Sequence, residues 1–178
     1  AVAPLATYLA FFRKYEDFIN IDKEAYVNDK LKVQRKDTES QEIELPVQVN
    51  LQAVISLIDD HLSQVADIEK NLPLEPINCG LFQVEVVSVR ELLLTKHREI
   101  VEIILAKQAG YCQEINNSMD EEFKKVHEKL SVRPETVEEV AEVEEYLQGL
   151  GMVNMSLSGC IADMGKYYEV LDQYRYKI

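Results

Sequence analysis

Residues 88–130, SVRELLLTKHREIVEIILAKQAGYCQEINNSMDEEFKKVHEKL, form the longest regular stretch of the sequence and decide its fold class. Side chains of one kind recur along it at steps of three and four residues, the spacing that places them on one face of an α-helix. Eight of the eleven positions in this stripe are apolar or tyrosine. Where the charged Glu122 interrupts the stripe, the neighbouring Phe123 is expected to supply the buried apolar side chain. The stripe consists of Leu93, His97, Ile100, Ile104, Gln108, Tyr111, Ile115, Met119, Glu122, Val126 and Leu130.

A single helix over this stretch would be roughly 65 Å long at 1.5 Å per residue. That length exceeds the width of a compact domain of 178 residues, so a bent helix or an elongated bundle is expected. Gly110 is the candidate kink, and the continuity of the helix through it is left open. The fold class predicted for the chain is all-α: an elongated helical bundle with one long central helix.

The next stretch, SVRPETVEEVAEVEEYLQGL at 131–150, is acidic but carries the signals of a helix start. Pro134 closes the long helix, and Thr136 and Glu139 have the spacing of a capping box. Gly149 and Gly151 are expected to end this second helix. Its acidity is therefore interpreted as an exposed helix face. The apolar stripe expected to be buried consists of Val137, Val140, Ala141, Val143 and Leu147, with Tyr146 beside it.

The rest of the sequence shows the patterns of further helices, and five or six are expected in the whole chain. One spans about 5–19, a second runs from the N-cap Asp22 to about 31, and a third runs from the N-cap Asn50 to about 72. The last begins near Met152, and its stripe consists of Leu157, Ile161, Met164, Tyr168 and Leu171, widened by Tyr167 and Tyr174. Only short extended or β segments are expected, near 43–49 or 81–87, and a polar mobile loop is expected at about 32–44.

Composition excludes several classes of protein. Hydrophobic residues make up 47% and charged residues 29% of the sequence, which excludes a wholly disordered chain. The net charge of −13 argues against a general nucleic-acid binder and against docking on anionic membranes. No apolar run approaches the ~20 residues of a membrane span, and no signal peptide is visible. The sequence reads as a single fragment, 1–178, cut from a longer protein.

No motif of reaction chemistry is present. The sequence lacks a phosphate-binding loop and a CxxC zinc pair, and the odd number of cysteines (Cys79, Cys112 and Cys160) fits inert thiols in a reducing, cytoplasmic compartment. His97 is interpreted as a core-edge histidine with a local hydrogen bond. Adjacent residues 59–61, Asp-Asp-His, point in different directions and make a poor cation site. We therefore assign no catalytic, cofactor-binding or metal-binding residue, and the binding residues stay unknown.

Three stretches together resemble a known family. They are INCGLFQVEVVSVRELLLTKHREIVEIIL at 77–105, EEFKKVHEKLSVRPETVEEVAEVEEYL at 121–147, and MGKYYEVLDQYRYKI at 164–178. In this order and spacing they resemble the tail, or stem, of dynein heavy chains of the axonemal type, just N-terminal to the linker and the motor ring. The resemblance covers about the last hundred residues well and the first seventy loosely.

The resemblance implies a structural, force-transmitting segment that links cargo or axonemal docking partners to the linker and the ATPase ring. The parent motor would be a microtubule-dependent ATPase of the cilium axoneme and cytoskeleton, and ATP and magnesium would bind in its ring, so no cofactor is expected in this fragment. The implied partners are intermediate or light chains, or neighbouring heavy-chain segments, with microtubules reached only through the parent motor.

Two other functions stay open. One is a cytosolic helical adaptor, of spectrin-like or vesicle-tether type, unrelated to a motor. The other is a helical enzyme in which Cys112 would pair with His97 or His127.

Overall fold

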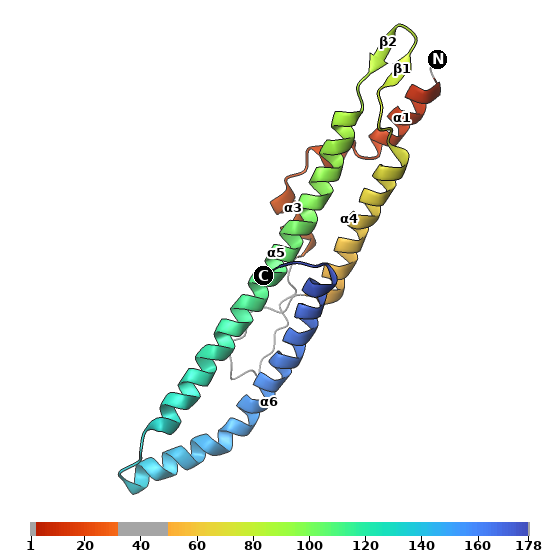
Figure 1. The fold of residues 1–178 in the computed structure, drawn as a ribbon. Helices are drawn as coiled ribbons and strands as arrows, with labels where there is room; N and C mark the ends of the chain where they lie inside the picture. The colour runs from red at the N-terminus through yellow and green to blue at the C-terminus, as the bar shows by residue number, and fades with distance from the viewer. Residues whose placement is uncertain (1–2, 32–49, 178) are drawn as a thin grey trace. The chain divides into compact units, whose positions relative to one another are not determined.

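The computed structural model describes residues 3–31 and 50–177, and in this part the chain is almost entirely helical. Its helices are α1 (Ala3–Arg13), α2 (Glu16–Ile19), α3 (Lys23–Lys30), α4 (Leu51–Asn71), α5 (Val87–Ser131) and α6 (Val137–Gln173), and its strands are β1 (Ile77–Cys79) and β2 (Phe82–Val84) (Figure 1). This confirms the all-α class with one long helix. The expected loop at 32–44 and the expected extended segment at 43–49 lie outside the described residues.

Helix α5 confirms the prediction from its repeating stripe. It is continuous for 45 residues, about 67 Å at 1.5 Å per residue, and it runs through Gly110 without interruption (Figure 1). The stripe is buried from Leu93 to Met119. The expectation for Phe123 was wrong, because its side chain is 50% exposed while Glu122 lies partly buried. The apolar stripe therefore weakens over the last turns of the helix.

The chain divides into two compact units. The described part of the first contains residues 3–31 and 50–106, and that of the second contains residues 107–177. The boundary falls within helix α5, so this helix contributes residues to both.

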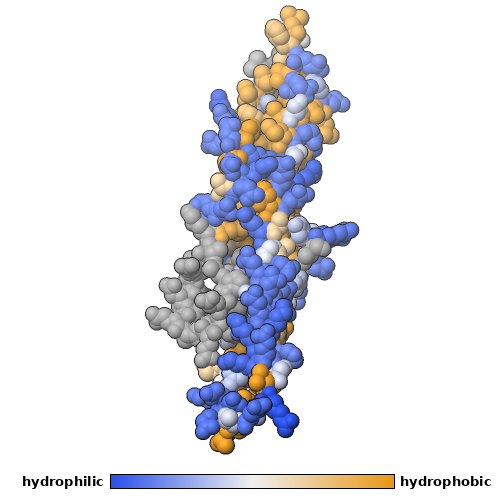
Figure 2. All heavy atoms as spheres, turned by 90° about the vertical axis from the view of Figure 1, so that its left-hand side faces the viewer, coloured by the Kyte–Doolittle hydropathy of each residue, from blue (hydrophilic) through white to orange (hydrophobic). Residues whose placement is uncertain are grey.

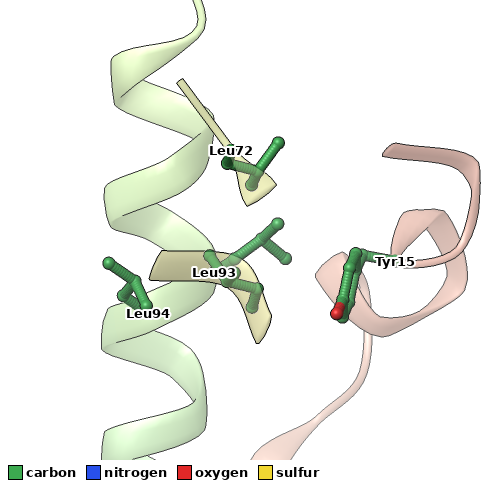
Figure 3. Packing of buried hydrophobic residues seen from close by; sticks show 5 residues of the cluster. Tyr15, Leu72, Leu93 and Leu94 are labelled. Atoms are coloured by element: carbon green, nitrogen blue, oxygen red, sulfur yellow. The ribbon is translucent and has the colours of Figure 1, made fainter. Parts of the chain in front are cut away.

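The first unit is built on α4 and the first part of α5. Asn50 caps α4 as predicted, since its Oδ1 accepts a hydrogen bond from the backbone N–H of Ala53 at 3.2 Å. Asp22 caps α3 in the same way, at 2.7 Å from the N–H of Ala25. The core cluster shown in Figure 3 is formed by Tyr15, Ile68, Leu72, Leu93 and Leu94.

The expectation of one helix over 5–19 was wrong. The helix breaks between Arg13 and Glu16, and Tyr15 at the break is buried in the core cluster. Its hydroxyl lies 2.8 Å from Oε1 of Gln64 and 3.0 Å from Oδ2 of Asp67, both on α4. Burial of the Tyr15 ring and these polar contacts offset the helical hydrogen bonds that the break removes.

A small antiparallel hairpin connects α4 to α5. Ile77 pairs with Val84 and Cys79 pairs with Phe82, and Gly80 between the strands has a φ of +72°, which a residue with a Cβ adopts only at a cost. Strand β2 falls in the segment expected near 81–87. Strand β1 was not predicted, because three residues beside two prolines carry no readable alternation.

The second unit contains the capping box predicted at the start of α6. The hydroxyl of Thr136 accepts a hydrogen bond from the N–H of Glu139, and the Glu139 carboxylate accepts one from the N–H of Thr136, both at 3.2 Å. A third bond, 2.7 Å long, joins the N–H of Glu135 to the same carboxylate, and together these bonds hold the pKa of Glu139 below its usual value. The box therefore satisfies orphan amides at the start of α6.

The expected helix end at Gly149 and Gly151 was wrong, and so was a separate helix starting at Met152. Helix α6 is a single element from Val137 to Gln173 (Figure 1). Neither glycine has the positive φ of a helix-ending residue, and a Cβ built on either meets no atom within 4 Å. Each glycine costs about 1 kcal/mol relative to alanine in a helix, which packing of the flanking turns can offset.

The buried face of α6 also differs from the predicted one. Ile161 and Tyr168 are exposed, and so are Val137, Val140 and Leu147 of the acidic first half. Counting partly and fully buried positions, the inner face follows Val143, Tyr146, Leu150, Val153, Leu157, Cys160, Met164, Tyr167 and Leu171. The acidic helix thus packs through a narrower face than its sequence indicates.

No helix among residues 3–31 and 50–177 combines the length and the apolar character needed to cross a bilayer.

Candidate functional site

The most unusual polar feature of the first unit is a buried pair of histidines. His61 on α4 and His97 on α5 are only 4% and 3% exposed, and their Nδ1 atoms lie 2.9 Å apart. At that distance one imidazole donates its N–H to the ring nitrogen of the other, so at least one of the two rings is neutral. The Nε2 atoms of both rings are buried without a hydrogen-bond partner among the described residues.

Aromatic side chains surround this pair. Phe18 of α2 stacks on His97 with ring centroids 4.1 Å apart and planes inclined by 16°. Tyr26 of α3 meets His61 edge-on at 5.6 Å, and Tyr15 meets His97 edge-on at 6.2 Å. The short helices α2 and α3 therefore cover the two imidazoles with apolar ring surface.

This environment keeps both histidines neutral. Burial, and then the proximity of His61, lowers the pKa of His97 to about 4. Burial also lowers the pKa of His61, although the nearby carboxylate of Asp60 opposes the shift. Because a neutral pair exchanges a hydrogen bond while a charged pair would repel, the neutral form fits the geometry.

Polar contacts join α2, α3 and the turn before α2 to α4 and α5. Lys96 donates a 2.5 Å hydrogen bond from Nζ to the carbonyl of Ile19, and its pKa is lowered by burial. Lys23 forms a 2.7 Å ion pair with Glu99. Lys14 pairs with Asp67 at 3.0 Å, and that contact lowers the pKa of the carboxyl.

A cavity of about 710 Å³ opens beside the histidine pair. Both signs of charge occur in its wall, from Lys14, Lys30 and Asp60. The lining consists of Lys14, Tyr15, Phe18, Tyr26, Lys30, Ala53, Ser56, Leu57, Asp60, His61, Gln64 and His97. It is the candidate binding pocket of this unit: aromatic rings and imidazoles offer stacking and hydrogen bonding rather than a nucleophile.

No group of three histidine, cysteine or acidic side chains able to hold an ion occurs within residues 3–31 and 50–177. Asp59 and Asp60 are exposed whereas His61 is buried, so the histidine side chain points away from the two carboxylates.

The cysteine–histidine pairs considered from the sequence are not brought together along α5. Cys112 lies fifteen residues from His97 and fifteen from His127 on one continuous helix, about 22 Å in each direction. Burial raises the pKa of the Cys112 thiol, which makes it less reactive. Cys79 and Cys160 are partly buried, and all three thiols are free.

Sequence reasoning missed the histidine pair as a pair. His97 was expected at the core edge with a local hydrogen bond, but its partner is 36 residues away. A signal was available: His61 lies on the same face of α4 as the buried Val54, Ile58 and Ile68. A buried imidazole needs a hydrogen-bond partner, and a second histidine on the buried face of a neighbouring helix can supply one.

In the second unit, tyrosines mark the seam between α5 and α6. Tyr111 and Tyr167 are buried and meet edge-to-face with centroids 5.4 Å apart. Tyr168 lies at the exposed border, where its hydroxyl accepts a 2.8 Å hydrogen bond from Asn116. Tyr111 and Tyr167 therefore lie within the contact between α5 and α6, and Tyr168 lies at its border.

Large apolar side chains are exposed on several elements of the described part, including Leu62 on α4 and Leu92 and Phe123 on α5, and they include two groups. One is the β1–β2 hairpin region, with Leu74, Phe82 and Leu81, which is 99% exposed; apolar surface gathers at the top of Figure 2, where this hairpin lies. The other is the outward face of α6. Large apolar groups left in water are characteristic of surfaces that meet a partner.

Comparison with known proteins gives one consistent result. No protein-family model matches the chain. Over all 178 residues the chain is 25% identical to dynein axonemal heavy chain 1 of Mus musculus and 24% identical to the same protein of Homo sapiens. The chain spans about 4% of the length of these relatives. It is therefore dynein-like in sequence along its whole length.

Proposed function

We propose that this chain is a structural, force-transmitting segment of a dynein-like heavy chain, placed in the tail before the linker and the motor ring. The similarity to axonemal heavy chains along the whole chain carries this proposal. In this role the segment links docking partners, such as intermediate or light chains or neighbouring heavy-chain segments, to the linker. It does so in the cilium axoneme, without catalysis of its own.

The continuity of α5 supports a mechanical role. A force along a helix is borne by its ladder of hydrogen bonds, and α5 maintains that ladder for 45 residues without a loop. In the second unit the Tyr111–Tyr167 contact and the Asn116–Tyr168 hydrogen bond join α5 to α6, and Ile115, Met119 and Met164 are buried. Such a seam resists local unwinding because each turn that opens exposes apolar surface.

Single-molecule stretching tests the mechanical role. The whole chain would be held by non-thiol handles attached at Ser88 and Ser131, the exposed ends of α5. Gly110→Pro removes a hydrogen bond from the middle of the ladder and should lower the unfolding force markedly, whereas Gly110→Ala should maintain or raise it. Equal unfolding forces for the two variants would contradict a load-bearing α5.

Two further observations separate this function from its rivals. Purified chain should release no phosphate from ATP, and turnover would overturn the non-catalytic role. In the full-length gene, a linker followed by repeated phosphate-loop motifs supports the motor, whereas their absence favours a cytosolic helical adaptor of spectrin-like or tether type.

A further inference from the structure

Helix α6 carries a second stripe on the side opposite the one that packs against α5. Its members recur at steps of three and four residues and are exposed: Val137, Val140, Glu144, Leu147, Gly151, Met155, Ser158 and Ala162. The exposed fractions reach 81% for Val137 and 78% for Met155, and Val140 and Leu147 are each 51% exposed. At 1.5 Å per residue the stripe is about 38 Å long.

This outer stripe has the composition of a helix-packing surface. Its first half presents two valines and a leucine, and its second half presents glycine, serine and alanine around Met155. Nothing lies within 4 Å of a Cβ built on Gly151, so this face has room for the close approach of another helix. Repeating steps of three and four residues are the pattern with which one helix packs along another.

The charged side chains of residues 134–165 are all negative, and Lys129 of α5, which lies over the ring of Tyr146, is a cation beside the first half of α6. Residues 134–150 contain six glutamates, and no lysine or arginine occurs from 134 to 165. Glu144 lies within the stripe itself, between Val140 and Leu147. Burying the Glu144 carboxylate in an interface without a cation beside it would be costly. A partner that covers the stripe must therefore place a cation opposite Glu144.

We propose that the outer stripe of α6 is the docking surface for a basic amphipathic helix, with an apolar stripe of its own and a lysine or arginine facing Glu144. The inference rests on the proposed function, because it assigns the docking role to one surface and one class of partner. A second copy of this chain fits poorly, since it would bring the same glutamates against one another in a chain of net charge −13.

The test uses the whole chain and a synthetic 26-residue helical peptide, with leucine in its stripe and lysine and arginine elsewhere. Fluorescence anisotropy measures binding. Val140→Ser with Leu147→Ser should weaken binding roughly tenfold, because two apolar anchors are lost. The matched control, Leu81→Ser with Phe82→Ser, removes exposed apolar side chains of the β1–β2 hairpin and should change the affinity by less than about twofold. Circular dichroism verifies that each variant is folded.

Two changes of charge test the electrostatic part. Glu144→Lys should weaken binding of the basic peptide and make it less sensitive to salt, because an attractive pair becomes repulsive. A peptide with glutamate in place of every lysine and arginine should not bind the unaltered chain. A basic peptide with the same composition and a scrambled stripe controls for unspecific attraction to an acidic protein.

Three outcomes would overturn the proposal. The first is equal affinity for the unaltered chain and the Val140/Leu147 variant. The second is equal binding of the scrambled or the acidic peptide. The third is dimerisation of the chain in sedimentation velocity that the same two substitutions abolish, which would assign the stripe to a second copy. None of these outcomes bears on the stretching experiment, so failure here and failure of the mechanical role are distinguishable.

Discussion

At the scale of single residues, the molecule shows how burial changes chemistry. His61 and His97 lie at buried positions covered by the rings of Phe18 and Tyr26, and this burial lowers the pKa of both imidazoles. The helix is interrupted at Tyr15, and there the ring lies in the core and the hydroxyl lies beside Gln64 and Asp67. Polar groups at such positions stay compatible with stability only when they find partners.

The histidine pair predicts a pH dependence of stability. The pKa of His97 is about 4 in the folded chain and near 6.5 when unfolded, so the unfolded state binds more protons between these values. Stability is therefore fully present above about pH 6.5 and falls as the pH drops toward 4, by on the order of 3 kcal/mol. Urea unfolding followed by circular dichroism between pH 7.5 and 4 measures it.

Carboxylates also titrate in that range, so the difference between variants is the readout. His61→Leu with His97→Leu should show a shallower fall of stability with pH, because no imidazole is left to protonate on unfolding. His127→Gln removes an exposed histidine of α5 and should retain the steep fall. Identical pH profiles for the double variant and the unaltered chain would contradict the assignment. The charged residues that line the cavity beside the pair, Lys14, Lys30 and Asp60, are present in all variants.

At the scale of elements, local signals determine where helices begin more reliably than where they end. Asp22, Asn50 and Thr136 each accept the amide hydrogen bond of an N-cap, as their sequence positions predict. Gly149 and Gly151 have the local signature of an end, but α6 continues through both. An N-cap acts within its own first turn, whereas the end of a helix depends on what the next turns pack against.

The glycines of α6 and of the hairpin should respond oppositely to alanine. Gly149→Ala and Gly151→Ala should each stabilise the chain by about 0.5–1 kcal/mol, since both sites are helical and open. Gly80→Ala should destabilise it, because φ at Gly80 is +72°. Chemical denaturation gives the three values. Loss of stability in either α6 variant would mean that a glycine there ends the helix after all.

At the scale of the whole molecule, acidity is the dominant property. The chain has 32 acidic and 19 basic side chains, and its ion pairs, such as Lys14–Asp67 and Arg98–Glu69, are largely exposed. Exposed pairs contribute little each, so repulsion among the unmatched carboxylates outweighs them. From the same excess of negative charge we expect basic partners rather than nucleic acid or anionic lipid.

This balance predicts stabilisation by salt. Raising NaCl from about 20 mM to about 300 mM shortens the Debye length to below 10 Å and should raise the free energy of unfolding. Glu142→Gln with Glu145→Gln reduces the excess charge and should reduce the gain. Thermal unfolding over a salt series measures both. A chain that loses stability with salt would show that its ion pairs, rather than its repulsions, dominate.

The sequence by itself determined the helical class, the apolar stripe of α5 and the three N-caps, because each depends on spacing or on contacts within one turn. That α5 continues through Gly110 was left open by the sequence and is decided by the structure. The sequence also indicated the similarity to dynein heavy chains, which the comparisons support along the whole chain. Only the tertiary structure decided that His61 meets His97, that Tyr15 interrupts the first helix, and which face of α6 turns inward. Helix α6 has apolar residues on two of its faces. Which face is buried depends on the surface of α5 that it packs against, and the local sequence of α6 carries no information about that surface.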